Sequence, residues 1–332
     1  MKAIYINKYN GKTILKDTNI PEISNDEVLI KIKASSVNPL DLLIIKGKLK
    51  LLQKYNMPLR IGSECSGIIE KVGENVKNFK VGDKIYTYLP MNNIGAFAEY
   101  ISINHKYIAK IPNNYDYKVA TAIPIASLTT YQIIKEELID YKKGDTIFIA
   151  GGSGSFGEIA IPILKHFGFE VIVSGNERSK EHILSIGASR YIDYKKEKYW
   201  EILNNVNYVI DTVGAKDFTK QLSILKEGGK IISLINVPNK KFAEKNNFNL
   251  GLKILFTMTG YKFDKLAKRE NKEYSFFFVK SNGEELANIT KIIEDNNINP
   301  RIDNNKFNLE NIDEALQLVD TGHTNGKVII EI

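Results

Sequence analysis

The segment of the sequence best suited to chemistry is a glycine-rich turn near the middle of the chain. A G-x-G-x-x-G pattern is formed by Gly152, Ser153, Gly154, Ser155, Phe156 and Gly157. An apolar run over 146–150 precedes the turn, and a helical pattern over 155–167 follows it. In that setting backbone N–H groups and the positive end of the helix face a pyrophosphate, which Gly154 lets approach closely. The turn predicts dinucleotide binding; the alternative is an ordinary glycine-rich connection between a strand and a helix.

The residues after the next apolar strand, 170–175, bear on which dinucleotide binds. A site that prefers NAD places an acidic residue about twenty positions after the glycines, at the end of this strand. Here the strand ends without one, whereas Ser174, Arg178 and Lys180 offer a hydroxyl and two cations for a 2′-phosphate. The pattern predicts NADPH as the cofactor. Glu177 argues against this, and a solvated helix start is the alternative explanation of the two cations.

Side chains able to bind a metal or to act as a nucleophile are sparse. The chain has one cysteine, Cys65, which follows Glu64, and four histidines without ligand spacing: His105, His166, His182 and His323. A catalytic zinc site needs three protein donors. We therefore expect no metal, a packing role for Cys65 and, because one cysteine cannot close a disulfide within the chain, a reducing compartment.

Two kinds of pattern must position these residues. Up to about residue 100, short runs rich in β-branched and aromatic residues alternate with turn residues, which predicts a mostly β domain. From about residue 145, nearly continuous apolar strands alternate with helices, as in a doubly wound parallel sheet of the Rossmann type. After about residue 260 this alternation changes, and the short final strands suit the β domain best.

Length, composition and charge narrow the class of protein. The 332 residues predict two domains, and 43% hydrophobic with 26% charged residues is typical of a folded protein. Net charge is +7, but the lysines are scattered, so nucleic-acid binding is not expected as the main function. No apolar run approaches the ~20 residues of a membrane span, and the first residues lack the core of a signal peptide. We expect a cytoplasmic protein.

Several motifs spread along the chain resemble one enzyme family. Besides the glycine turn they are 35–47, 62–86, 95–100, 126–132, 209–214 and 326–332. Together they resemble the zinc-independent quinone oxidoreductase (zeta-crystallin-like) branch of the medium-chain dehydrogenases/reductases. The resemblance implies a homodimer whose chain forms a GroES-like catalytic domain from 1–122 and 263–332 and a Rossmann domain from 123–262.

The same resemblance implies roles for individual residues. Zinc-containing relatives carry a cysteine and a histidine where this chain has Asn38 and Ser63, which are poor zinc ligands. Asn38 and Asp41 would lie beside the nicotinamide. Further cofactor contacts would come from Thr129, Tyr194, Val213, Leu234, Ile235, Phe277, Phe278 and Lys327. Asp211 to Gly214, the segment that contains Val213, would also lie near the cofactor. For Asp211 the alternative is a turn former, and for the two phenylalanines it is a place in the core.

One departure from the family concerns proton donation. Many related reductases place a tyrosine shortly after the glycine that corresponds to Gly47, but here Lys48 and Leu49 follow. Tyr55 is the candidate replacement, and a packing or surface tyrosine is the alternative.

The sequence thus predicts metal-free hydride transfer from NADPH to quinones or α,β-unsaturated carbonyls. Proximity would supply most of the rate, Asn38 would donate a hydrogen bond to the developing oxyanion, and Asp41 would fix the loop. The alternatives are an enoyl-thioester reductase and a non-catalytic NADPH- or RNA-binding protein.

Overall fold

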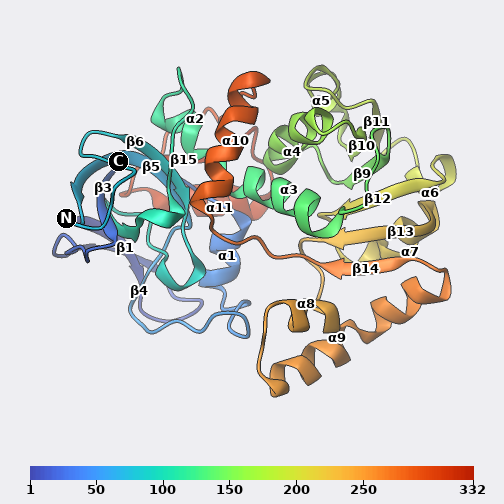
Figure 1. Ribbon diagram of the computed structural model, residues 1–332, viewed down its shortest axis with the longest axis horizontal. Helices are drawn as coiled ribbons and strands as arrows, with labels where there is room; N and C mark the ends of the chain where they lie inside the picture. Colours follow the sequence, from blue (N-terminus) through green and yellow to red (C-terminus); the bar gives the residue numbers. More distant parts are fainter. The chain divides into compact units, whose positions relative to one another are not determined.

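The computed structural model describes residues 1–332, and the chain divides into two units (Figure 1). Unit 1 contains Met1–Leu128 and Lys280–Ile332, so it is built from both ends of the chain. Unit 2 contains Thr129–Val279. None of the helices combines the length and apolar character that crossing a bilayer requires.

Unit 1 is dominated by antiparallel strands. One sheet has six strands in the order β15-β3-β5-β6-β8, with β7 pairing with β3, and a smaller sheet has the order β2-β1-β4. The strands are β1 (Lys2–Ile6), β2 (Thr13–Asp17), β3 (Glu27–Ser36), β4 (Leu59–Arg60), β5 (Glu64–Val72), β6 (Lys84–Tyr88), β7 (Tyr100–Asn104), β8 (Ala109–Lys110) and β15 (Ile329–Glu331). The predicted mostly β domain is confirmed.

The helices of unit 1 lie between and after these strands. They are α1 (Pro39–Ile45), α2 (Tyr117–Thr121), α10 (Gly283–Asp295) and α11 (Ile312–Thr321), with the short 3-10 helices η1 (Met91–Asn93) and η2 (His105–Tyr107). Helix α3 (Pro124–Glu137) begins in unit 1 and continues into unit 2.

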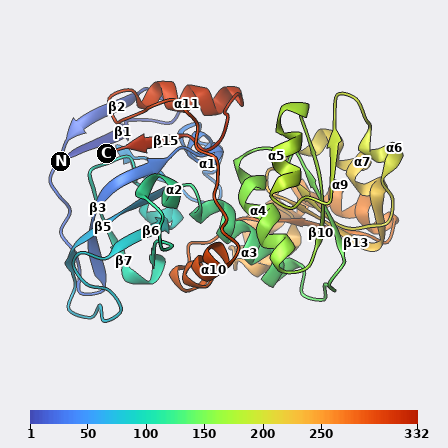
Figure 2. The same ribbon diagram turned by 90° about the horizontal axis from the view of Figure 1, so that it is seen from above.

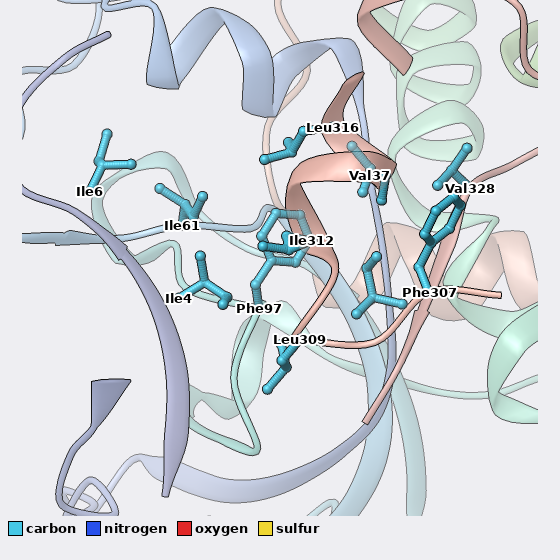
Figure 3. Close-up of a cluster of buried hydrophobic side chains, with 12 residues drawn as sticks. Ile4, Ile6, Val37, Ile61, Phe97, Phe307, Leu309, Ile312, Leu316 and Val328 are labelled. Atoms are coloured by element: carbon cyan, nitrogen blue, oxygen red, sulfur yellow. The ribbon is translucent and has the colours of Figure 1, made fainter. Parts of the chain in front are cut away.

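The end of the chain is held in unit 1 by both strand pairing and core packing. Strand β15 pairs antiparallel with β3, placing Ile330 opposite Ser35. Figure 3 shows side chains from the first hundred residues packed against side chains from α11 and its flanking segments. This cluster contains Ile4, Ile6, Val37, Ile61, Phe97, Phe307, Leu309, Ile312, Ala315, Leu316, Val328 and Ile330, all buried. Burying apolar area drives the association, so the two chain ends form one body.

Unit 2 is built on a parallel sheet with the strand order β11-β10-β9-β12-β13-β14. Its strands are β9 (Thr146–Ala150), β10 (Glu170–Gly175), β11 (Arg190–Asp193), β12 (Val206–Asp211), β13 (Leu225–Ser233) and β14 (Glu273–Phe276). The chain starts in the middle, winds to one edge and then to the other, which is the doubly wound Rossmann order. The predicted fold class is confirmed.

Helices cover both faces of this sheet. They are α4 (Ser155–His166), α5 (Lys180–Ser185), α6 (Tyr199–Ile202), α7 (Phe218–Ile224), α8 (Lys240–Lys245) and α9 (Leu250–Arg269), with η3 (Glu177–Ser179) and η4 (Ala215–Asp217). In Figure 2, α4 and α5 lie on one face and α6 and α7 on the other. Two covered faces explain why the strands are almost continuously apolar.

The return of the chain to unit 1 comes later than the boundary predicted at residue 263. Helix α9 extends to Arg269, and β14 then adds a sixth strand in parallel with β13, so the return comes at Lys280. The helix exposes Leu250, Ile254 and Met258, so its sequence does not separate an apolar from a polar face. Apolar residues on more than one face weaken the helical period of this segment.

Candidate functional site

In unit 1, Asn38 lies where strand β3 gives way to helix α1. It is the N-cap residue, with φ −123° and ψ 153°, and Pro39 follows as the first helical residue. Its backbone N–H donates to Oδ2 of Asp41 at 2.8 Å. Proline and a carboxylate both suit the first turn of a helix, so the N-P-x-D sequence itself specifies this bend.

Glu64 is the centre of the hydrogen-bond network around Asn38. Its Oε1 accepts from Ser36 Oγ, from Asn38 Nδ2 at 3.0 Å and from Lys327 Nζ at 2.5 Å. Its Oε2 accepts from the backbone N–H of Ile125, at the start of α3, at 2.9 Å. Glu64 is 0% exposed and Lys327 5%. A buried carboxylate is tolerable only when it is paired and its lone pairs are satisfied, and both conditions are met here.

The same network fixes the side-chain amide of Asn38. Its Oδ1 accepts from Lys327 Nζ at 2.6 Å, while its Nδ2 donates to Glu64 and, at 3.4 Å, to the carbonyl of Ser36. An amide held between a cation and an anion has one favoured orientation. The N–H groups of Asn38 are therefore already engaged within unit 1, which weakens its predicted role as an oxyanion donor.

Asp41 occupies the next buried position of the cluster. Its Oδ1 accepts from Ser63 Oγ, the hydroxyl at the position where zinc-containing relatives carry histidine. Burial raises the pKa of Asp41 to about 7, although the hydrogen bonds from Ser63 and Asn38 favour the ionised form. Asp41 thus connects the start of α1 to Ser63, and burial favours the protonated form of its carboxyl.

This pKa predicts a pH-dependent contribution of Asp41 to stability. The folded protein keeps the proton up to about pH 7, whereas the unfolded chain loses it near 3.8. The contribution of Asp41 to the free energy of unfolding is therefore complete in acid and is lost as the pH rises toward 7. The free energy of unfolding of the wild type, minus that of Asp41→Asn, should fall by roughly 1.4 kcal/mol per pH unit between about pH 5 and pH 7. Urea unfolding at several pH values measures this difference, and parallel curves for the two proteins would contradict it.

The Glu64–Lys327 pair yields a second prediction. Lys327→Met leaves a buried carboxylate without its cation and should cost about 3–5 kcal/mol of unfolding free energy. The double variant Glu64→Gln/Lys327→Met removes both charges and should recover much of that loss. Lys46→Met is the matched control, because it breaks an exposed pair with Asp320 and should cost less than about 1 kcal/mol. If the single and double variants were equally unstable by denaturant unfolding, the ion pair would not be the source of the stability.

Tyr55, the predicted replacement for the missing tyrosine, is only half-buried. Its hydroxyl lies 3.8 Å from the sulfur of Met91, and its backbone N–H donates to the hydroxyl of Tyr9 at 3.2 Å. Burial, followed by the nearby Tyr9 and Asp41, raises its pKa, so it stays protonated. Its catalytic role remains a prediction.

No group of three or more histidine, cysteine, aspartate or glutamate side chains is arranged to hold a metal ion. Cys65 is fully buried among core side chains of the six-stranded sheet that contains β5. Burial and the neighbouring Glu64 raise its pKa to about 12, so the thiol packs as an apolar group, as predicted.

In unit 2, the glycines of the predicted binding turn have different roles. A Cβ atom on Gly157 would fall 1.8 Å from the carbonyl oxygen of Gly152, so this glycine closes the turn on itself. A Cβ atom on Gly154 would meet nothing within 4 Å. Gly154 is the N-cap of α4 and faces open space, and it has no side chain to cap the N–H groups of Ser155 and Phe156. The turn can thus accept an anionic group.

Ser174 supports this turn from the neighbouring strand. It is the penultimate residue of β10, and its Oγ accepts from the backbone N–H of Gly151 at 3.1 Å. Gly151 itself has φ of +75°, a conformation that favours glycine. The serine hydroxyl is therefore engaged in holding the turn, and contact with a 2′-phosphate would use its remaining donor.

The charged residues after β10 lie on the surface. Arg178 and Lys180 are exposed, and Tyr194 is 59% exposed. Glu177, the residue that argued against a phosphorylated cofactor, is ion-paired with Lys196. Its charge is therefore partly compensated within the protein.

Asp211, at the end of β12, is a turn-forming residue. Its Oδ1 accepts from the backbone N–H groups of Val213 and Gly214 at 3.0 and 2.8 Å and from Gln221 Nε2 at 2.8 Å, and its Oδ2 accepts from Ser233 Oγ at 2.6 Å. This supports the turn-former alternative.

The remaining predicted cofactor residues fall into exposed and buried groups. Val213 and Ile235 are 45% and 51% exposed, and a Cβ on Gly151 would touch Val213. Leu234 donates its backbone N–H to the carbonyl of Asp211 at 3.0 Å. These residues and the glycine turn follow the carboxyl ends of β9, β12 and β13, where ligands bind in open α/β sheets.

Buried positions were also among the predicted contacts. Thr129 is buried on α3, and Phe277 is 4% exposed, with its backbone N–H bonded to the carbonyl of Ser233 at 2.9 Å. Phe278 is half-buried. Phe277 thus serves the core, and its contact with a cofactor stays a prediction.

The central role of Glu64 is not predicted by the sequence, in which this residue stands out only as the neighbour of Cys65. Glu64 directly follows Ser63, in the part of the motif where zinc-containing relatives carry Gly-His-Glu. The place of Glu64 directly after Ser63, where zinc-containing relatives carry histidine, was the available signal. No local sequence pattern indicates that Ser36 and Lys327 contact Glu64.

Residues 24–113 match the model of the alcohol dehydrogenase GroES-like domain, and residues 186–330 match the model described as zinc-binding dehydrogenase. Over 99% of its length the chain is 31% identical to a mitochondrial NAD(P)H oxidoreductase of Dictyostelium discoideum, of which it covers 99%.

Two further matches extend this picture. The chain is 29% identical to a chloroplastic NADPH-dependent alkenal/one oxidoreductase of Arabidopsis thaliana, over 99% of this chain and 79% of the relative. The solved structure of the quinone oxidoreductase from Coxiella burnetii superposes with a TM-score of 0.83 at 27% identity, covering 100% of this chain and 99% of that one. These matches confirm the family resemblance drawn from the motifs.

Proposed function

Because the chain belongs to the medium-chain dehydrogenase/reductase superfamily, we propose that it reduces quinones or α,β-unsaturated carbonyl compounds with NADPH. The observation that carries the proposal is the glycine turn at the carboxyl end of β9, whose open Gly154 and uncapped α4 amides suit a pyrophosphate. The relatives named for alkenal/one and quinone reduction support the choice of acceptor.

The residues of unit 2 fit a dinucleotide in three ways. The α4 amides would hold the pyrophosphate, the space over Gly154 would admit it, and the exposed apolar side chains of Val213 and Ile235 would cover apolar parts of the cofactor. When bound, the reduced nicotinamide supplies a hydride. Everything else must be done by the protein: binding, orientation and the exclusion of water.

The preference for NADPH rests on charge at the end of β10. No acidic residue ends that strand, and Glu177 is paired with Lys196. Arg178 and Lys180 are exposed close by in sequence and would bind a 2′-phosphate, with Tyr194 beside it. NADH lacks this phosphate and would gain nothing from these cations.

The residues of unit 1 would polarise the acceptor without a metal. Lys327 supplies a buried positive charge, and its ion pair with Glu64 holds the Asn38 amide in one orientation. A preorganised cation and fixed dipoles stabilise negative charge that develops on a carbonyl oxygen. Asn38 and Ser63 take the positions of metal ligands in relatives, so we propose a zinc-independent reaction.

Steady-state assays test the proposed function. We expect loss of NADPH absorbance with simple quinones and with an α,β-unsaturated ketone, and a kcat/KM at least about tenfold lower with NADH, since each 1.4 kcal/mol of lost phosphate binding corresponds to a factor of ten. Activity should survive dialysis against a metal chelator. Equal use of NADH would refute the NADPH assignment, and no turnover with any acceptor would refute the reductase assignment.

The glycine turn offers a matched pair of variants. Gly154→Ala adds a methyl group where the structure has open space, so the fold should be unchanged while NADPH binds on the order of tenfold more weakly, because the methyl group meets the pyrophosphate. Gly157→Ala would clash with Gly152 and should lower the melting temperature. Calorimetric titration with NADPH and thermal unfolding separate the two effects. Unchanged affinity in Gly154→Ala would mean that the cofactor does not approach this turn.

A further inference from the structure

Tyr88, at the end of β6, carries a hydroxyl group that has no hydrogen-bond partner in the protein. The side chain is 1% exposed, and its oxygen is buried. Most buried side-chain polar atoms in folded proteins are paired, so an unpaired one requires an explanation. Phenylalanine would fill the same space without the cost of removing a hydroxyl from water.

Tyr86 provides the comparison within the same strand. It is two residues earlier, so it lies on the same face of the sheet, and it is also fully buried. Its hydroxyl is bonded to Thr290 Oγ1 at 2.9 Å and lies 3.4 Å from the carbonyl oxygen of Leu286, on α10. The two tyrosines share their strand, face and burial, and they differ in whether the hydroxyl is satisfied.

The strand register places Tyr88 beside Glu64. In the antiparallel register of β5 and β6, Tyr88 is directly opposite Glu64, so both side chains leave the sheet on the same face. Glu64 is the acceptor that organises Asn38 and Lys327. Burial, and then the neighbouring Tyr55, Asp41 and Glu64, raise the pKa of Tyr88, so its hydroxyl remains a proton-bearing donor at any working pH.

We propose that the Tyr88 hydroxyl donates a hydrogen bond to the carbonyl oxygen of the acceptor, in place of the tyrosine that is absent after Gly47. This inference rests on the proposed function. As the hydride adds to the electron-poor carbon, the π electrons of the conjugated system move onto this oxygen. Tyr88 stabilises the resulting enolate or quinol anion while keeping its own proton, and water supplies the proton that completes the reduction. Contact requires side chains that cover the hydroxyl to move, and catalytic hydrogen bonds commonly tighten only in the complex.

The test compares Tyr88→Phe with Tyr86→Phe. In Tyr88→Phe, kcat should fall about a hundredfold, the effect of removing one oxyanion donor, with unchanged NADPH affinity and with stability equal to or above that of the wild type. The fall should be larger for an enone than for a quinone, because the quinone spreads its charge over two oxygens. In Tyr86→Phe, which loses the bond to Thr290, stability should fall and kcat should stay near the wild-type value.

Each other outcome overturns a specific part of the inference. If Tyr88→Phe keeps the wild-type kcat with both acceptors, the hydroxyl is not the donor. If Tyr88→Phe loses as much stability as Tyr86→Phe, or does not fold, its hydroxyl is bonded in the native protein and the structural basis of the proposal is wrong. A wild-type protein that turns over no acceptor would contradict the proposed function instead, so the two failures are distinguishable.

Discussion

The organisation of unit 1 depends on one buried ion pair, between Glu64 on β5 and Lys327 just before β15. Both side chains are buried, so either charge without its partner would lower the stability of the fold. The partners come from opposite ends of the chain. Strand β15 pairs with β3, and α11 packs on the first strands, and together these contacts bring Lys327 next to Glu64. The ion pair therefore forms only when the end of the chain is packed against its beginning. Fold and site are therefore coupled through a single contact.

Units 1 and 2 prepare their binding groups by different physical means. Unit 1 uses side chains: Glu64 and Lys327 orient the amide of Asn38, and burial keeps the carboxyl of Asp41 near its titration midpoint at neutral pH. Unit 2 uses the backbone, because Gly154 faces open space and leaves helix amides without a side-chain cap. In the first arrangement, each polar side chain is held by hydrogen bonds to the others. In the second, the amides are oriented by the turn and the helix to which they belong.

This difference explains what the sequence could predict. The glycine turn, the parallel sheet and the mostly β domain follow from local spacing and periodicity, and the structure confirms them. The boundary expected at residue 263 places the sixth strand, β14, with the β domain, whereas β14 pairs with β13. The exposed apolar side chains of α9 weaken the helical period that precedes this strand. No local sequence pattern indicates the contact of Lys327 with Glu64, because the two residues lie near opposite ends of the chain. Family motifs drew attention to the region of Asn38, but the register that places Tyr88 opposite Glu64 required coordinates.

The cluster also bears on how such a site stabilises negative charge. In relatives with a catalytic metal, positive charge would come from an ion held by residues at the positions of Asn38 and Ser63. Here an ammonium group lies against Asn38 Oδ1, and Glu64 is already neutralised by it. A divalent cation brought to the same atoms would compete with Lys327 for one carboxylate oxygen and would be repelled by the ammonium charge. Lys327 therefore fixes a positive charge of the protein against Asn38 and Glu64.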